Sequence, residues 1–359
     1  MANAGAVPPP YPTTPPATGV TGLHHVTVIA GDPQQTLDFY VGVLGLRLVK
    51  RTVNQDAPDT YHFFFADGAG TPGSEVTFFP WPTMPPGRRG AGLTNEVALA
   101  VPPGSLAYWA DRLRAVGVSA GARVTRFGAA TLPFEDPHGL ALALVESDAL
   151  DDAARGFAPW AASPVPADRQ VRGLHAVRLV TGAPAATARF LEEALGLAPA
   201  GEEDGWHRFA VPNAPGASGG TGASGRIVDV RAAGETGRGA WGVGAVHHVA
   251  FRVPDDAAEL AARRRIGAAG GHTTDVIDRF WFHSIYFREP GGALFEVATD
   301  GPGFAVDEDP AALGEQLILP PFLEPRRAEI ERVLPPVTVP RPTPAGAAPS
   351  GAGVPATDA

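Results

Sequence analysis

Two pairs of adjacent histidines and one glutamate are the residues of this chain best suited to metal chemistry. The segment "GLHHVTVIAGDP" supplies one pair, "VHHVAFRVPDD" supplies the other, and "ALFEVA" holds the carboxylate; the residues are His24, His25, His247, His248 and Glu296. Two histidines and one carboxylate on rigid strands form the facial triad that binds Fe(II) or Mn(II) and leaves coordination positions open. That chemistry requires one histidine from each pair to meet the glutamate.

Alternation of side chains along a strand indicates which histidine of each pair faces the metal. Neighbouring side chains of a regular strand point to opposite faces. His247 shares its face with Val249 and an apolar run, which suits packing beneath a helix, whereas His248 shares its face with more polar neighbours. By the same offset His25 faces inward from the first pair, and Glu296 projects away from its two apolar neighbours. We therefore expect His25, His248 and Glu296 to be the metal ligands.

A structural role without a metal is the competing interpretation for each of these residues. A single histidine on a strand is more often a packed, hydrogen-bonded core residue than a ligand. A glutamate inside an apolar run is harder to explain in this way, because burying a carboxylate without a partner costs free energy. The three residues together, at related places in a repeat, favour a metal site.

The chain repeats itself, and the repeats place these residues on equivalent elements. Residues 22–46 match residues 173–197, including the Leu-Gly-Leu with which each segment ends. Two further pairs of segments match in the same way, 95–117 with 247–270 and 126–148 with 279–300. The sequence therefore divides into four modules, residues 22–80, 93–148, 172–231 and 245–300.

Each module has the pattern of a βαβββ unit. A short apolar strand is followed by a turn rich in Gly, Pro or Asp and by an apolar-periodic helix, and three strand-like runs complete the module. One such sheet leaves a face that must be covered, so the modules should pair. We predict an α+β protein whose four modules pair into two cup-shaped sheets.

Pairing of the first module with the fourth would bring the three ligands into one cup. Modules two and three would then form a counterpart that has lost its ligands, because the equivalent positions hold Ala176, Glu96 and Ala143. Sequential pairing, within residues 22–148 and within residues 172–300, is the alternative, provided that the two cups abut.

The remaining segments are expected to be tails, a linker and an extension. A composition rich in Pro, Ala and Thr predicts disordered tails over residues 1–20 and 337–359. Residues 149–171 are expected to link the two halves of the chain, and residues 301–336 to pack on the core as a C-terminal extension.

Composition argues against several classes of function. A formal charge of -10 and a pI near 5.5 disfavour a nucleic-acid footprint or an anionic membrane surface, which need clustered Lys and Arg. The absence of cysteine removes disulfides, thiolate nucleophiles and thiolate metal sites. The first residues lack the basic start and apolar run of a secretory signal, and no run reaches the length of a membrane span. We therefore expect a cytoplasmic protein that acts on small molecules and binds neither nucleic acid nor membrane.

Several longer motifs resemble a known superfamily. The segments "GLHHVTV", "KRTVNQDAPDTYHFFFADGAGTPGSEVTFFPW", "HHVAF", "YFREPGGALFEVATDGPGF" and "DEDP" are similar to the vicinal oxygen chelate superfamily, which includes glyoxalases, bleomycin-resistance proteins and extradiol dioxygenases. Within it, they most resemble the hydroquinone ring-cleaving dioxygenases. The likeness extends over about residues 22–336. The motif that begins at Lys50 is fairly specific, whereas "HHV" alone is not.

The resemblance implies a set of site residues and a reaction. Iron would be bound by His25, His248 and Glu296, in agreement with the alternation argument. The residues around the metal and the substrate would be His24, Thr27, His247, Arg279 and Tyr286. For His24 and His247 to reach the pocket, their strands must twist or bulge. The implied enzyme is a non-haem Fe(II) dioxygenase, with Mn(II) as the alternative metal, that opens an aromatic diol of the hydroquinone type with O2.

Two other functions stay open at this point. A glyoxalase-like isomerase would use the metal for proton abstraction, but it usually needs an extra ligand and a carboxylate base that the matching strand positions do not offer. A metal-free protein that sequesters a small molecule, such as an antibiotic, has no need of two histidines and a glutamate in one cup. The sequence is also compatible with a homo-oligomer.

Overall fold

The computed structural model describes residues 19–147, 156–212 and 225–345. The predicted N-terminal tail up to residue 18, residues 149–155 of the predicted linker and residues 346–359 of the predicted C-terminal tail lie outside these ranges.

Four modules of the predicted βαβββ type make up the folded chain. Module one contains β1 (Gly22–Ala30), α1 (Pro33–Leu37) continued by the π-helical turn η1 (Asp38–Val43), β2 (Arg47–Asn54), β3 (Ala57–Ala66) and β4 (Glu75–Pro80). Module two contains β5 (Leu93–Val101), α2 (Leu106–Ala115), β6 (Val124–Arg126), β7 (Ala129–Glu135) and β8 (Ala141–Glu146). Module three contains β9 (Gly173–Thr181), α4 (Pro184–Glu193), β10 (Ala198–Glu203), β11 (Trp206–Ala210) and β12 (Ile227–Ala232). Module four contains β13 (Val246–Val253), α5 (Asp256–Ala268), β14 (Ile277–Asp278), β15 (Phe282–Arg288) and β16 (Leu294–Pro302).

Turn residues determine where the helices of the ligand-bearing modules begin. Asp32 caps α1 by accepting a hydrogen bond from the backbone N–H of Gln35 at 2.8 Å, and Pro33 occupies the first turn of this helix. Asp255 caps α5 in the same way by accepting from the backbone N–H of Ala258 at 2.9 Å. A carboxylate at this position satisfies a backbone donor that the helix leaves unpaired. These caps place each helix directly after the first strand of its module.

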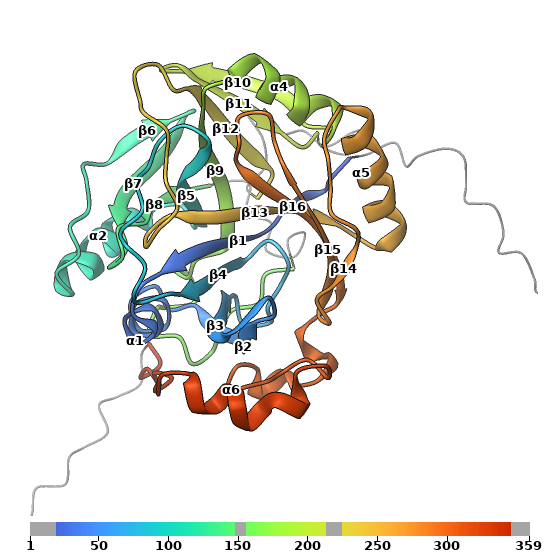
Figure 1. Ribbon diagram of the computed structural model, residues 1–359. Helices are drawn as coiled ribbons and strands as arrows, with labels where there is room; N and C mark the ends of the chain where they lie inside the picture. The colour runs from blue at the N-terminus through green and yellow to red at the C-terminus, as the bar shows by residue number, and fades with distance from the viewer. Residues whose placement is uncertain (1–18, 148–155, 213–224, 346–359) are drawn as a thin grey trace, which may run out of the picture.

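The modules pair as predicted, one with four and two with three. One eight-stranded sheet has the order β14-β15-β16-β13-β1-β4-β3-β2, and the other has the order β10-β11-β12-β9-β5-β8-β7-β6. The central pairs are antiparallel, β1 with β13 and β5 with β9. Figure 1 shows both curled sheets, with the helices at the periphery. We call their concave sides the histidine cup, after His25 and His248, and the arginine cup, after Arg178 and Arg208.

Two β-bulges interrupt the junction between β1 and β13. The register between the strands shifts by one residue at each bulge, and the extra residues are His24 on β1 and His247 on β13. A bulge bends the strand and redirects side chains. Regular alternation, which predicted that His24 and His247 turn toward the helices, is therefore wrong at these two positions.

The same bulges occur in the second sheet. The register between β5 and β9 shifts at Asn95 and at His175, the counterparts of His247 and His24. The bulges are therefore a property of the repeated module and do not depend on metal ligands.

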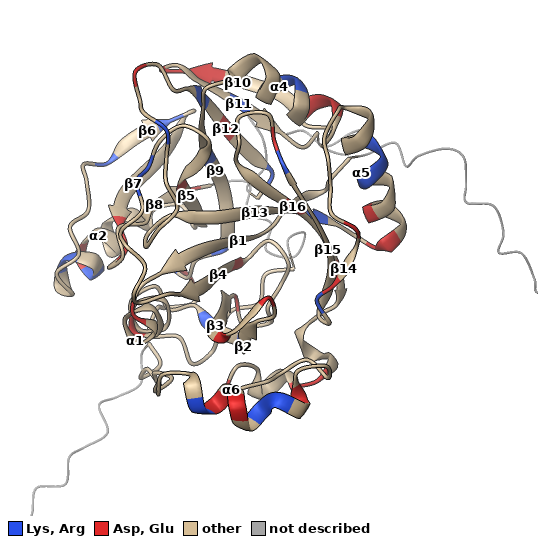
Figure 2. Ribbon diagram, in the orientation of Figure 1, with Lys and Arg blue, Asp and Glu red and all other residues tan. Residues whose placement is uncertain are grey.

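A C-terminal extension covers the module-one edge of the histidine cup. Leu319, Leu323 and Ile330 are buried in the main core, and α6 (Arg327–Val333) packs on β3. Figure 2 shows basic and acidic residues interleaved along α6. Residues 337–345, which the sequence analysis assigned to the tail, continue along the core, where the backbone N–H of Thr338 donates to the side chain of Gln34 at 2.8 Å.

Among the described residues, no helix combines the length and apolar character needed to cross a membrane.

Candidate metal centre

Three adjacent strands, β1, β13 and β16, bring His25, His248 and Glu296 together in the histidine cup. The Nε2 atoms of His25 and His248 lie 3.3 Å apart. Oε2 of Glu296 lies 2.8 Å from Nε2 of His248 and 3.4 Å from Nε2 of His25. All three residues are buried. The ligand set predicted from the sequence therefore converges on one point.

The spacing of these three atoms fits a metal ion. Bonds from nitrogen or oxygen ligands to a first-row divalent metal are roughly 2.0–2.2 Å long, so two such ligands at right angles lie about 3 Å apart. Oε2 of Glu296 is buried and makes no hydrogen bond of acceptable geometry to any residue that the structure describes, although both imidazoles lie within 3.4 Å. Because a buried carboxylate oxygen needs a donor or a cation, the three side chains are better arranged to share a cation than to bond to each other.

Each histidine of the triad contacts the first histidine of its pair. Nδ1 of His24 lies 3.0 Å from Nδ1 of His25, and Nδ1 of His247 lies 2.8 Å from Nδ1 of His248. The ring of His247 also stacks on Trp241 with a centroid separation of 4.6 Å. A hydrogen bond to the outer nitrogen fixes the orientation and tautomer of a ligating imidazole. The two bulges place both supporting histidines where they can do this.

A backbone carbonyl determines which nitrogen of His25 is available to a metal. Nε2 of His24 lies 3.2 Å from the carbonyl oxygen of Thr299, which can only accept a hydrogen bond. Burial lowers the pKa of His24 to about 3, and the neighbouring His25 lowers it as well. His24 is therefore neutral, with its proton on Nε2, and its Nδ1 accepts from the Nδ1–H of His25. This leaves the Nε2 lone pair of His25 directed at His248 and Glu296.

Glu296 is held as a carboxylate. Oγ of Ser284 donates a hydrogen bond of 2.5 Å to Oε1, the oxygen that does not face the histidines. Burial raises the pKa of Glu296, but His25 and His248 lower it by more, so that the pKa lies well below its usual value. The side chain therefore contributes a full negative charge to the site at neutral pH.

His62 on β3 also lines the pocket, and the sequence analysis did not identify it. Its Nε2 lies 3.0 Å from Oγ1 of Thr77, which in turn lies 2.7 Å from Oγ1 of Thr27. Burial, together with the nearby ligand histidines, lowers the pKa of His62 well below its usual value. The repeat gave no signal, because module three has Trp206 at the equivalent position. Side-chain alternation could have identified His62, because His62 shares a strand face with Phe64 in the motif that begins at Lys50 and resembles the family.

Arg279 and Tyr286 lie at the entrance to the same pocket. The guanidinium of Arg279 pairs with Asp56 at 3.0 Å and lies 5.3 Å from the centre of the Tyr286 ring. Asp56 is 73% exposed, so this ion pair lies where the pocket meets solvent. Gln55 donates to the backbone carbonyl of Arg279 at 2.8 Å. The ring of Tyr286 contacts His248 edge-on, and burial raises the pKa of Tyr286.

A narrow cavity of about 40 Å³ reaches the ligand histidines. Its walls are mostly aromatic, formed by Phe64, Phe79, Trp281, Phe282 and Tyr286. Such walls suit a flat ring placed over His25 and His248.

The arginine cup lacks the His-His-Glu triad and contains a network of ion pairs. The equivalent positions hold Ala176, Glu96 and Ala143, as the sequence indicated. Asp229 lies 2.8 Å from Arg208 and 3.4 Å from Arg178, and all three are buried. Glu96 pairs with Arg126 at 2.6 Å. This charge network fills the cup, which explains how the repeat keeps its shape without the triad.

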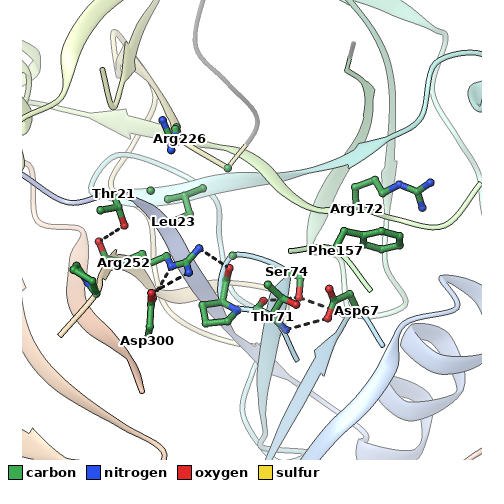
Figure 3. A pocket seen from close by; sticks show the side chains of 15 residues that line it. Thr21, Leu23, Asp67, Thr71, Ser74, Phe157, Arg172, Arg226, Arg252 and Asp300 are labelled. Atoms are coloured by element: carbon green, nitrogen blue, oxygen red, sulfur yellow. Dashed lines mark hydrogen bonds and ion pairs between the residues drawn. The ribbon is translucent and has the colours of Figure 1, made fainter. Parts of the chain in front are cut away.

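A larger cavity of about 270 Å³ lies beside Arg252 and Asp300, away from the triad. Arg252 pairs with both carboxylate oxygens of Asp300, at 2.5 and 2.9 Å, and Asp67 accepts from the backbone N–H of Thr71 at 3.0 Å. Figure 3 shows these contacts across the cavity. Its charges are thus used to join neighbouring segments, and none of the described residues that line it is a histidine.

The paired modules and the buried triad define a class of protein, and comparison with known families agrees. The model of the Glyoxalase/Bleomycin resistance protein/Dioxygenase superfamily matches residues 22–144 and 173–297. The chain belongs to this superfamily.

Its relatives narrow the class. The protein named ring-cleaving dioxygenase MhqO of Bacillus subtilis (strain 168) is 41% identical over 319 residues, which are 89% of this chain and 97% of the relative. The chlorohydroquinone/hydroquinone 1,2-dioxygenase of Sphingobium indicum is 34% identical over 323 residues, 88% of this chain and 96% of the relative. A crystal structure of a dioxygenase from Bacillus subtilis has a TM-score of 0.82 at 40% identity and covers 90% of this chain and 100% of its own. The chain is therefore an enzyme of the ring-cleaving dioxygenase class.

Proposed function

We propose that this chain is a non-haem Fe(II) dioxygenase that opens a hydroquinone-type aromatic diol with O2. The convergence of His25, His248 and Glu296, with one carboxylate oxygen lacking a hydrogen bond, carries the proposal. The relative that is a chlorohydroquinone/hydroquinone 1,2-dioxygenase supports the substrate class. Mn(II) suits the same ligands.

Different residues of the pocket would have different roles around the metal and the substrate. Fe(II) bound by three protein ligands would supply open positions at which a phenol hydroxyl becomes more acidic and can react with O2. Tyr286 is protonated, because burial raises its pKa, and its hydroxyl can donate a hydrogen bond to a substrate oxygen. Arg279 can stabilise negative charge that develops on that oxygen. His62 lines the same cavity and lies within hydrogen-bond distance of Thr77.

The size of the cavity limits the substrate. A volume of 40 Å³ accommodates about three water-sized spheres, so even a single aromatic ring requires some widening. The ion pair between Arg279 and Asp56 is the contact best placed to open, because it lies at the solvent end and joins the β2–β3 turn to module four. Single-ring diols should therefore be accepted far better than fused-ring diols.

The position that could supply a fourth ligand is occupied by a threonine. Within the repeat, Thr77 pairs with Thr27 as Glu296 pairs with Ala250. The hydroxyl of Thr77 lies within hydrogen-bond distance of Thr27 and His62. A glyoxalase-like isomerase, which usually needs a further ligand and a carboxylate base, therefore fits this site less well than a dioxygenase.

Oxygen consumption tests the proposal directly. Enzyme loaded with iron without air should take up about one O2 per ring when it is given a hydroquinone, and catechol is the diol to compare. A hemithioacetal, the substrate type of a glyoxalase, should not be isomerised. Isomerisation of the hemithioacetal with no oxygen uptake from any diol would overturn the proposal.

A charge-removing variant tests the role of Glu296. Glu296→Gln keeps the shape of the side chain but removes its charge, so bound iron and turnover should fall together. Glu192→Gln, at an exposed site on α4, should change neither. Full iron content with normal turnover in Glu296→Gln would show that Glu296 is structural.

Metal analysis separates the enzyme from a metal-free binding protein. Chain purified without air should carry iron or manganese, and close to one ion per chain should be lost in Glu296→Gln. A metal-free chain that nevertheless binds an aromatic compound tightly would favour sequestration over catalysis.

A further inference from the structure

A second cluster of metal-ligating side chains lies on the helix-covered side of the same sheet. It consists of Asp256 and Glu259 on α5 and His283 on β15, and one ligand atom of each lies within 4.8 Å of those of the other two. His283 points toward α5, because its Nδ1 pairs with Asp256 on that helix, whereas the side chain of the following Ser284 points into the histidine cup. Figure 1 shows α5 beside β15, and Figure 2 shows acidic residues at the start of this helix.

The imidazole of His283 is fixed between carboxylates. Its Nδ1 lies 2.7 Å from Oδ1 of Asp256, and its Nε2 lies 3.8 Å from Oδ1 of Asp278. The backbone N–H of His283 donates to Oγ1 of Thr299 at 2.9 Å. The ring is therefore held in place while it remains 32% exposed, which leaves it open to an ion from solvent.

Glu259 is the residue that indicates a missing partner. It is 0% exposed, and within the described part of the chain neither of its buried carboxylate oxygens has a hydrogen-bond partner. Arg263, one turn further along α5, donates instead to Thr273 at 3.1 Å and to Asp275 at 2.6 Å. A buried carboxylate without a donor is costly, and a cation between Glu259 and its neighbours would offset this cost.

The helix places both carboxylates on one face without needing either as a cap. Asp256 and Glu259 are three residues apart, so their side chains are neighbours on the helix surface. Capping is provided by Asp255, whose side chain accepts from the backbone N–H of Ala258. Asp256 and Glu259 are therefore free of the usual structural task of acidic residues at a helix start.

We propose that Asp256, Glu259 and His283 bind a divalent first-row metal ion, for which Zn²⁺ is the probe. Two carboxylates and an imidazole suit such an ion, whereas Mg²⁺ favours oxygen ligands alone. The ion replaces the hydrogen bond between His283 and Asp256 and balances the buried charge of Glu259. It thereby ties the start of α5 to β15, the strand that carries Ser284 and Tyr286 into the histidine cup.

The number of bound zinc ions tests this site. Wild type, Glu259→Gln and the exposed control Glu192→Gln are equilibrated with Zn²⁺ as full-length protein, and bound metal is counted by mass spectrometry. Glu259→Gln should bind about one zinc fewer than wild type, and Glu192→Gln should match wild type. Because the result is a difference, it does not depend on what binds at His25. Equal zinc in all three proteins would overturn the site.

Thermal unfolding gives an independent readout. Zn²⁺ should raise the Tm of wild type, because a ligand that binds only the folded state stabilises it, and it should raise the Tm of Glu259→Gln by less. Without zinc, Glu259→Gln should unfold at the same temperature as wild type or higher, since it loses an unpaired buried carboxylate. His283→Gln, at a partly exposed ring, provides the same comparison if Glu259→Gln folds poorly. A zinc-dependent rise that is the same in both variants as in wild type, or an equal rise with Mg²⁺, would contradict the proposal.

Discussion

At the scale of single residues, the candidate centre depends on groups that do not face the metal. The Thr299 carbonyl determines which ring nitrogen of His24 carries the proton, and His24 in turn determines which ring nitrogen of His25 carries it. The ligand atom of His25 is thus specified by a chain of two hydrogen bonds that ends in the backbone of β16. A change at His24 should be felt as weaker metal binding, although His24 is not one of the proposed ligands.

His24→Phe should weaken iron binding by roughly 10- to 100-fold, the usual cost of removing the partner of a ligating histidine. Phenylalanine keeps a ring beside Phe282 but cannot accept the hydrogen bond from His25. The measurement is an anaerobic iron titration. The matched control is His175→Phe, at the equivalent bulge of the arginine cup, which should bind iron like wild type. Equal affinities for both variants would contradict the role of His24.

His62→Phe should lower turnover on the order of 10²-fold with iron content unchanged, because a pocket hydrogen-bonding group is lost while the ligands remain. The new ring would pack between Phe64 and Phe79, which already contact His62. Steady-state oxygen uptake and iron analysis of the same preparation provide the two measurements. His207→Phe, at an exposed position on β11, is the control and should change neither. A parallel loss of iron would mean that His62 supports the ligands.

Sequence reasoning went furthest for residues whose role follows from side-chain alternation. It placed His25, His248 and Glu296 on one face, and the structure brings them together. Alternation alone could not place His24 and His247, which the family resemblance assigned to the pocket, because a bulge depends on the pairing of two strands that are distant in sequence. His62 was missed for a related reason, since its significance appears only once β3 is seen to border the cup.

At the scale of elements, the two cups show how one sheet design can hold either a buried His-His-Glu triad or a salt-bridge network. The arginine cup keeps the bulges and the strand order of its partner, but it lacks the triad and holds an ion-pair network of Asp229, Arg178 and Arg208. Buried charges of this kind stabilise a fold only while all partners are present.

Asp229→Ala should destabilise the protein by about 3–5 kcal/mol, because it leaves Arg208 buried without its carboxylate and leaves Arg178 with only Glu96, at 3.8 Å. Urea unfolding monitored by fluorescence measures this change. The control is Glu135→Ala, which removes an ion pair whose partners are 50% and 53% exposed and should cost no more than about 1 kcal/mol. Iron affinity should stay unchanged in both, and a loss of iron in Asp229→Ala would show that the cups are coupled.

The arrangement of the elements was largely predictable from the repeat. Matching segments defined the four modules, and the need to join His25 to Glu296 selected the pairing of the first with the fourth. The side chains of the arginine cup could be predicted from the sequence only in part. Glu96 and the two alanines showed that ligands were lost, but the network around Asp229 required knowledge of which strands face each other.

At the scale of the whole molecule, the extension is connected to the pocket through Lys50. This buried lysine, the only one in the chain, pairs with Asp307 at 2.7 Å and with Glu308. Asp307 also accepts from the indole N–H of Trp281 at 3.0 Å, and Trp281 forms part of the pocket wall. The start of the extension is thus fixed to the same residues that shape the substrate cavity.

Lys50→Met should loosen the extension and raise KM for the diol, with iron content unchanged. The variant leaves Asp307 and Glu308 without their cation, so the segment after β16 should become more sensitive to limited proteolysis. Cleavage sites are read by mass spectrometry and KM from oxygen uptake. Arg326→Met, at an exposed position of the extension, should behave like wild type. Unchanged cleavage in Lys50→Met would show that apolar packing alone holds the extension.

The extension also shows a limit of predicting disorder from amino-acid composition. Residues 337–345 are richer in proline than the rest of the predicted tail, yet they hydrogen-bond to Gln34 and Ser163 along the core. Proline content disfavours helices and sheet interiors, but it does not prevent an extended segment from packing on a surface that the rest of the fold has already formed.

The pairing of the outermost modules has a consequence for how the protein is made. During synthesis His25 leaves the ribosome early, whereas His248 and Glu296 follow only near the end of the chain. Until β13 emerges, β1 has an unpaired edge on the side that will become the metal site. Modules two and three can already pair in this interval, since they are consecutive. Under the proposed function the metal site is therefore completed late in synthesis, and a prematurely terminated chain that lacks β16 also lacks Glu296.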